Sequence, residues 1–123
     1  MTDILILDDD EQILRLARTM AEREGYSVTT VDNGAEALAV LEEQQPALLI
    51  TDILMPGIDG IEVINLCRKR FPALKIIAMS GGRRKITADF NLKSATMLGA
   101  DATLAKPFAK DHLIRAIRQL VPA

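Results

Sequence analysis

Residue types that build cross-links and many catalytic or metal sites are scarce in this chain of 123 residues. It has one cysteine, Cys67, which excludes an internal disulfide, and one histidine, His112. A single thiol without partner ligands is typical of a small side chain in a helical core and fits a reducing compartment. No four-helix pattern accompanies His112, so we expect a surface or structural role for it rather than phosphotransfer.

The chain also lacks a large excess of positive or negative charge, and it has no long hydrophobic run. Fifteen Lys and Arg stand against seventeen Asp and Glu, a formal net charge of -2, which leaves no global field for nucleic acid or an anionic membrane. Aliphatic runs such as Ile4–Leu7 are far shorter than the ~20 residues that span a bilayer, and the first residues carry no basic segment. We expect one cytoplasmic domain over residues 1–123.

The apolar pattern alternates between short continuous runs and helical spacing, as in βαβ units that cover a parallel sheet on both faces. Strands are predicted at 4–7, 27–31, 47–51, 75–79 and 102–104. Helices are predicted at 10–24, 33–43, 60–70, at a segment that ends near 98, and at 109–120. At this size five such units favour a flavodoxin-like α/β fold, a (βα)5 three-layer sandwich with strand order 2-1-3-4-5.

Four consecutive acids, Asp8 to Glu11, follow the first strand. Helix capping accounts for part of this cluster, because Asp9 and Gln12 match a D-x-x-Q box and the next two acids suit a helix N-terminus. Asp8 and Asp9 should also face Asp52, which follows the third strand, across the switch point of the sheet. Carboxylates ~5 Å apart repel by roughly 3 kcal/mol at an effective dielectric of ~20, more than the dipole offsets.

Three explanations for the facing acids stay open: a hard divalent cation such as Mg²⁺, raised pKa values, or a fixed cation from the protein. Lys106, after the fifth strand, can supply such a cation, and Ser80 ends the fourth strand. An ammonium and a hydroxyl beside a carboxylate and a metal suit the oxygens of a phosphoryl group. Either residue alone indicates little, but their joint placement at strand ends predicts a phosphoryl site.

With these motifs the sequence resembles the receiver domain of bacterial two-component response regulators, including the chemotaxis regulators, over essentially its full length. The matching segments are LDD at 7–9, ITDILMPGIDG at 50–60, MSGG at 79–82 and KPF at 106–108. Their order is that of the family. The resemblance implies a signalling phosphoacceptor that assists its own phosphorylation, not an enzyme in the usual sense.

By this resemblance Asp52 takes a phosphoryl group from a partner's phosphohistidine and becomes an acyl phosphate. Mg²⁺ is bound directly by Asp9, through water by Asp8, by the Leu54 carbonyl and by Asp52 itself. Lys106 pairs with Asp52 at rest and with a phosphoryl oxygen afterwards, across a cis Lys106–Pro107 bond. Ser80 and the Gly81 amide hold the other oxygens.

The resemblance also implies the partners: a sensor histidine kinase or histidine phosphotransfer protein, and a downstream protein that docks on the face of helix four, strand five and helix five. We expect a monomer or weak dimer, without direct nucleic-acid or membrane contact. Many relatives have an aromatic residue three positions before the lysine, where this chain has Thr103. A conformational switch that is smaller, or routed differently, is therefore expected.

Three features of the sequence allow more than one interpretation. The cations Arg83, Arg84 and Lys85 either belong to a solvated loop or attract an acidic phosphate donor. Leu54 and Gly82 stand at positions that influence acyl-phosphate hydrolysis in relatives, and they predict no lifetime here. The chain ends at Ala123 without a second domain, as in a stand-alone receiver or one excised from a longer regulator or hybrid kinase.

Two other classes compete with a receiver. An aspartate-nucleophile phosphatase would also use Mg²⁺ and a strand-end Asp, but it usually has a second acid two residues later, where this chain has Leu54. A flavodoxin-like cofactor binder needs a Ser/Thr-rich phosphate loop after the first strand. The acids that follow that strand here would repel phosphate, so both classes are disfavoured.

Overall fold

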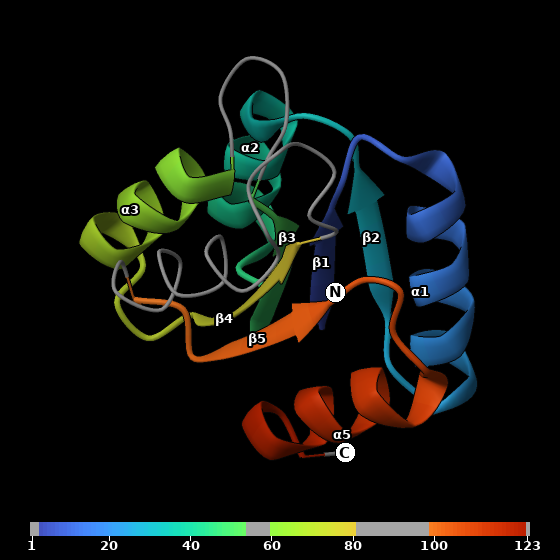
Figure 1. The fold of residues 1–123 in the computed structure, drawn as a ribbon. Coiled ribbons are helices and arrows are strands. Elements are labelled where there is room, and N and C mark those ends of the chain that lie inside the picture. Colours follow the sequence, from blue (N-terminus) through green and yellow to red (C-terminus); the bar gives the residue numbers. More distant parts are fainter. Residues whose placement is uncertain (1–2, 54–59, 81–98, 123) are drawn as a thin grey trace.

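The computed structural model describes residues 3–53, 60–80 and 99–122. Strands and helices alternate through the first two of these ranges, and the third contains a strand followed by a helix, as the hydrophobic pattern predicts (Figure 1). The strands are β1 (Ile4–Leu7), β2 (Val28–Val31), β3 (Leu48–Asp52), β4 (Lys75–Ser80) and β5 (Ala102–Ala105). The helices are α1 (Glu11–Arg23), α2 (Gly34–Gln44), α3 (Gly60–Arg70) and α5 (Lys110–Leu120). The helix predicted to end near 98 lies outside the described residues.

All five strands pair in parallel in the order β2-β1-β3-β4-β5. This order confirms the predicted flavodoxin-like α/β fold. The strand order reverses between β1 and β3, where Leu7 is in register with Thr51. Asp8, which follows β1, and Asp52, the last residue of β3, therefore lie next to each other at one edge of the sheet.

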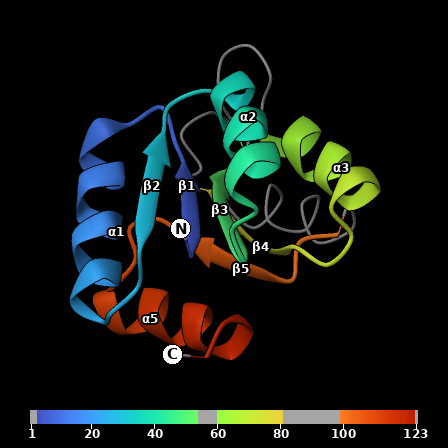
Figure 2. The same ribbon diagram turned by 180° about the vertical axis from the view of Figure 1, so that it is seen from behind.

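The sheet separates two hydrophobic cores, because successive side chains of a strand point to opposite faces. Leu5 and Leu7 of β1 belong to the core beneath α2 and α3, whereas Ile4 and Ile6 belong to the core beneath α1 and α5. Figures 1 and 2 show the two helix pairs on opposite sides of the sheet. Cys67 of α3 is fully buried in the first core, which confirms its prediction as a core thiol.

Local signals place most helix ends close to their predicted positions. Gly25, with φ of 94°, follows the end of α1, and Gln45, with φ of 47°, caps α2 directly before Pro46. Asn33 caps the start of α2 by accepting the backbone N–H of Glu36 at 2.9 Å. No helix in the described ranges is long and apolar enough to cross a bilayer.

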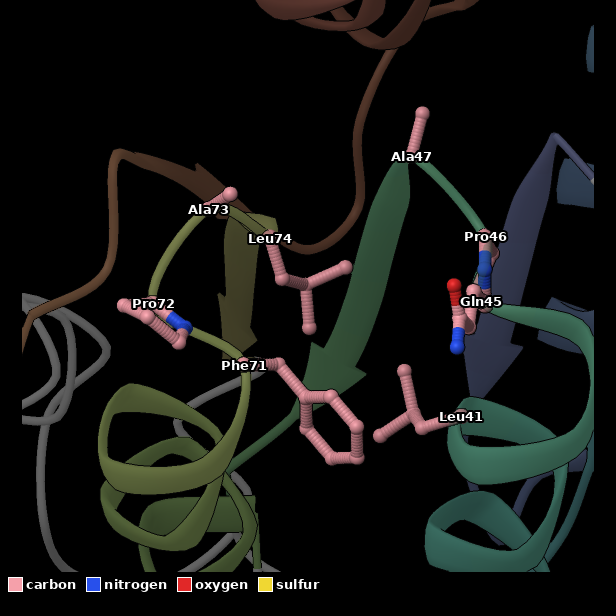
Figure 3. Close-up of a pocket in the computed structure, with 8 residues that line it drawn as sticks. All are labelled: Leu41, Gln45, Pro46, Ala47, Phe71, Pro72, Ala73 and Leu74. Atoms are coloured by element: carbon pink, nitrogen blue, oxygen red, sulfur yellow. The ribbon is translucent and has the colours of Figure 1, made fainter.

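An apolar groove of about 360 Å³ lies at the end of the sheet where the strands begin. Two similar loops, Gln45–Ala47 and Phe71–Leu74, line it together with Leu41 (Figure 3). In both loops Pro-Ala is followed by Leu, and the loops lead into β3 and β4 respectively. This groove is remote from the polar strand ends and is not part of the site described next.

Candidate functional site: an acidic crevice at the carboxyl edge of the sheet

The polar residues selected from the sequence gather at the edge where the parallel strands end. Asp8 follows β1, Asp52 and Ser80 are the last residues of β3 and β4, and Lys106 follows β5. Backbone hydrogen bonds continue beyond the strands here: the N–H of Asp8 donates to Val31 at 3.3 Å and that of Lys106 to Ser80 at 2.9 Å. The sheet thus fixes the backbone from which each of these side chains projects.

Three carboxylates form the centre of the crevice. Asp8, Asp9 and Asp52 each offer an oxygen, and these oxygens lie within 4.8 Å of one another. Asp8 is fully buried and Asp52 is 3% exposed, whereas Asp9 is exposed. The predicted convergence of these three acids across the switch point is confirmed, with Asp9 on the solvent side of the cluster.

Among the described residues, Lys106 is the cation of this crevice, and its closest carboxylate is that of Asp8. Its Nζ lies 2.6 Å from Asp8 Oδ2 and 3.5 Å from Asp52 Oδ2. The expected pairing with Asp52 is therefore present, but the shorter contact with Asp8 was missed. The sequence carries no signal for it, because a flexible four-carbon stem that crosses from β5 reaches either strand end.

Opposing influences act on the pKa of Asp8. Burial raises the pKa of this carboxyl above its ordinary value, because the charged form loses hydration. The hydrogen bonds from Lys106 and from the Asp10 N–H act in the other direction. These two hydrogen bonds therefore favour the charged form of Asp8. The bond from Lys106 is the largest of the influences that lower its pKa.

The Asp9–Gln12 capping box predicted from the sequence is wrong. Asp10 is the N-cap of α1, and its Oδ1 accepts the backbone N–H of Gln12 at 2.9 Å. Asp9 instead belongs to the carboxylate cluster. The one-residue shift arises because β1 ends at Leu7 and the chain needs Asp8 and Asp9 to turn toward the helix.

The donor set of this crevice fits a hard divalent cation. Among the residues that the structure describes, its three carboxylates outnumber the one ammonium, that of Lys106, and these groups together carry a negative excess in a largely buried place. Carboxylate oxygens are preferred ligands of Mg²⁺, which commonly uses one or two of them and keeps several waters. The exposed position of Asp9 leaves room for such waters on the solvent side.

Of the other residues predicted from the sequence, some lie in the part of the chain that the structure describes and some do not. Ser80 is 1% exposed at the end of β4, one residue beyond Met79, which is in register with Asp52. Thr103 is exposed on β5 and His112 is exposed on α5. Both line a shallow hollow of about 450 Å³ between these elements. The predictions for Leu54, Gly81, Gly82 and 83–85 fall outside the described residues.

Two contacts around Asp52 were not predicted. The hydroxyl of Thr51 donates to the carbonyl oxygen of Asp52 at 2.8 Å, and the N–H of Ile53 donates to the Met79 carbonyl at 3.1 Å. Together they hold the backbone on both sides of Asp52. The Lys106–Pro107 peptide bond is cis, as the resemblance implied.

The chain is similar in sequence to known proteins. The family model of the response regulator receiver domain matches residues 4–118. The chain is 37% identical over 121 residues to the alkaline phosphatase synthesis transcriptional regulatory protein PhoP of Bacillus subtilis, covering 96% of this chain and 48% of that protein. It is 30% identical over 122 residues to protein PilG of Pseudomonas aeruginosa, covering 98% and 87% respectively. The chain thus spans about half of PhoP and most of PilG.

Solved structures of receiver domains are also similar to this chain. The receiver domain of NtrX from Brucella abortus has a TM-score of 0.90 at 29% identity, over 97% of this chain and 98% of that one. A CheY-like receiver domain protein from Methanospirillum hungatei has a TM-score of 0.85 at 31% identity, over 97% and 92%. With the family model matched along nearly its whole length, the chain belongs to the response regulator receiver domain family of two-component signal transduction.

Proposed function

We propose that Asp52 accepts a phosphoryl group from a phosphohistidine of a sensor kinase or histidine phosphotransfer protein. The observation that carries this proposal is the placement of Asp52, a buried carboxylate 3.5 Å from the Lys106 ammonium at the carboxyl edge of the sheet. A carboxylate is a weak nucleophile, so the site must contribute alignment and charge neutralisation. The backbone contacts at Thr51 and Ile53 support that alignment.

The transfer balances with one proton from water. An oxygen of Asp52 forms a bond to phosphorus while the phosphorus–nitrogen bond of the donor breaks, and the imidazole leaves as a neutral ring after it takes this proton. The Lys106 ammonium offsets charge on one phosphoryl oxygen, and the Ser80 hydroxyl donates to another. The expected Gly81 amide contact lies outside the described residues and is part of the same proposal.

Mg²⁺ is the cofactor that the carboxylate cluster suits. We assign Asp9 and Asp52 as direct ligands and Asp8 as a ligand through water, together with the expected Leu54 carbonyl. When bound, the ion neutralises charge shared by the nucleophile and the phosphoryl oxygens. The two buried acids with one lysine between them support this assignment.

We expect a downstream protein to recognise the phosphorylated domain at the surface formed by β5 and α5. The hollow there is lined by small residues such as Ala102, Thr103 and Ala116, and also by Arg115 and Gln119. This open surface supports docking of a downstream protein. Thr103 supplies no aromatic side chain for a switch, so we expect phosphorylation to change this face only modestly or by another route.

Intact-mass measurement after incubation with a small acyl-phosphate donor and Mg²⁺ tests the proposal. The wild-type protein should gain the mass of one phosphoryl group, and Asp52→Asn should gain none. Asp111→Asn is the matched control, because it removes an exposed carboxylate from the first turn of α5. It should be labelled like the wild type. A full adduct on Asp52→Asn would refute the assignment of the nucleophile.

A further inference from the structure

We propose that the hydroxyl of Thr51 positions the phosphoacceptor, acting through the backbone of Asp52 from the opposite face of the sheet. The inference rests on the proposed function, because it takes Asp52 as the residue that gains the phosphoryl group. The side chain of Thr51 points away from the crevice, and its hydroxyl bonds the backbone of Asp52. Thr51 is therefore a positioning residue and not a catalytic one.

Thr51 places a polar group in an apolar setting. It is fully buried, and Leu49 and Ile53, two residues before and after it, belong to the core beneath α2 and α3. A hydroxyl in such a place costs free energy unless it is hydrogen-bonded. Valine has the same branched shape and suits a strand equally well, so packing alone gives no reason for the hydroxyl. The other buried acidic or Ser/Thr side chains of the described residues are those of the crevice: Asp8, Asp52 and Ser80.

The hydroxyl of Thr51 completes the fixation of one peptide unit. It donates to the carbonyl oxygen of Asp52 at 2.8 Å. The N–H of the same peptide unit, that of Ile53, donates to the carbonyl oxygen of Met79 at 3.1 Å. A peptide unit is planar, so a bond on its C=O and another on its N–H together fix its orientation. The backbone that leaves Asp52 is thus held from both sides.

This peptide unit lies at the place where regular strand pairing ends. β3 ends at Asp52, and the register between β1 and β3 extends only as far as the pair of Leu7 and Thr51. The hydroxyl of Thr51 therefore adds a bond just beyond the last paired residue. Because a β-branched side chain is stiff at χ1, that bond holds the carbonyl in one direction.

The orientation of this peptide unit affects the nucleophile directly. One methylene joins the carboxyl group of Asp52 to the backbone, so a tilt of the neighbouring peptide shifts the carboxylate with it. A buried carbonyl that has lost its donor gains by turning toward another. A misplacement of about 1 Å can cost roughly 10²-fold in rate, and a smaller tilt costs less. Lost alignment lowers the rate constant of transfer and leaves donor binding unchanged.

Time courses of intact mass at a series of concentrations of a small acyl phosphate, with Mg²⁺, test the role of Thr51. Thr51→Val should lower the maximal rate constant roughly fivefold and keep the half-saturating donor concentration within about twofold. Thr51→Ser keeps the hydroxyl and should retain most of the rate. A wild-type rate for Thr51→Val would overturn the proposal, and so would a Thr51→Ser variant as slow as Thr51→Val.

Thr30→Val is the matched control, because Thr30 is a half-buried threonine of the neighbouring strand β2. It should leave both kinetic constants unchanged. Circular dichroism of each variant checks that folded proteins are compared. The NMR resonance of the Asp52 carbonyl carbon reports the hydrogen bond without any phosphoryl donor. It should move upfield in Thr51→Val and stay in place in Thr30→Val, and an unmoved resonance in Thr51→Val would refute the proposal.

Failure of the proposed function looks different from failure of this inference. A wild-type protein that gains no phosphoryl group, or an Asp52→Asn variant that gains one, would overturn the assignment of the nucleophile, and the role of Thr51 would fall with it. If the wild type is labelled at Asp52 and Thr51→Val is labelled at the same rate, the proposed function stands and only the role of Thr51 is refuted.

Discussion

Arg68 and Asp101 form an ion pair in which the guanidinium Nη2 lies 2.6 Å from the carboxylate Oδ2. It joins the last turn of α3 to the residue before β5. The same guanidinium donates to the carbonyls of Gly99 and Leu74, each at 2.7 Å, and Asp101 also accepts the N–H of Ile76 at 2.8 Å. This Arg68 network holds three segments together at the end of the sheet opposite the acidic crevice.

Arg68→Ala should lower the free energy of unfolding by roughly 2 to 3 kcal/mol, because several partly buried acceptors lose their donor at once. Urea denaturation measures the change. Arg118→Ala is the control, since it removes an exposed ion pair with Glu24, and such pairs contribute about 0 to 1 kcal/mol. Equal losses for the two variants would show that the Arg68 network adds nothing beyond a surface ion pair.

Gly99→Ala should destabilise the protein more than Gly25→Ala. Both glycines have positive φ, 114° and 94°, so both substitutions cost about 1 kcal/mol in backbone strain. A Cβ at Gly99 would also lie 2.8 Å from Arg68 Cγ, whereas one at Gly25 meets nothing within 4 Å. Thermal denaturation compares the two. In an Arg68→Ala background the excess cost of Gly99→Ala should vanish, and its persistence would locate the strain elsewhere.

Cys67 should make the protein less stable at alkaline pH. Burial raises the pKa of its thiol from 9.0 to about 11. The unfolded chain therefore loses this proton at lower pH than the folded one, and stability is full below pH 9.0 and declines toward pH 11. The decline should approach roughly 3 kcal/mol. Urea titrations across this range measure it, and Cys67→Ala should have a shallower slope whatever its absolute stability.

Ser80→Ala should slow uptake of a phosphoryl group from a small acyl phosphate by roughly tenfold or more, because one hydrogen-bond donor to the phosphoryl oxygens is lost. Ser80→Thr keeps the hydroxyl and should retain most of the rate. Thr103→Ala removes an exposed hydroxyl on β5 and serves as the control. The time course of the intact-mass shift gives the rates. An unchanged rate for Ser80→Ala would remove Ser80 from the site.

The sequence predicted elements and strand order because both follow from local patterns. Buried runs such as Ile4–Leu7 and Leu48–Asp52, separated by amphipathic segments, allow few arrangements other than a parallel sheet. Once that sheet is assumed, the edge at which Asp8, Asp52 and Lys106 meet follows directly. The helix cap was misplaced by one residue, since three consecutive acids offer equivalent capping side chains and only the end of β1 selects Asp10.

What the sequence alone determined, then, is the parallel sheet and the residues that stand at its carboxyl edge, since both depend on periodicity and on chain order. The tertiary structure decided which of those residues contact one another. Lys106 lies closer to Asp8 than to Asp52, and Arg68 links Gly99 with Asp101, although no spacing in the chain encodes either contact. A long side chain can reach several partners, and which of them it contacts depends on distances in the folded state. Those distances are set only when the strands and helices pack together.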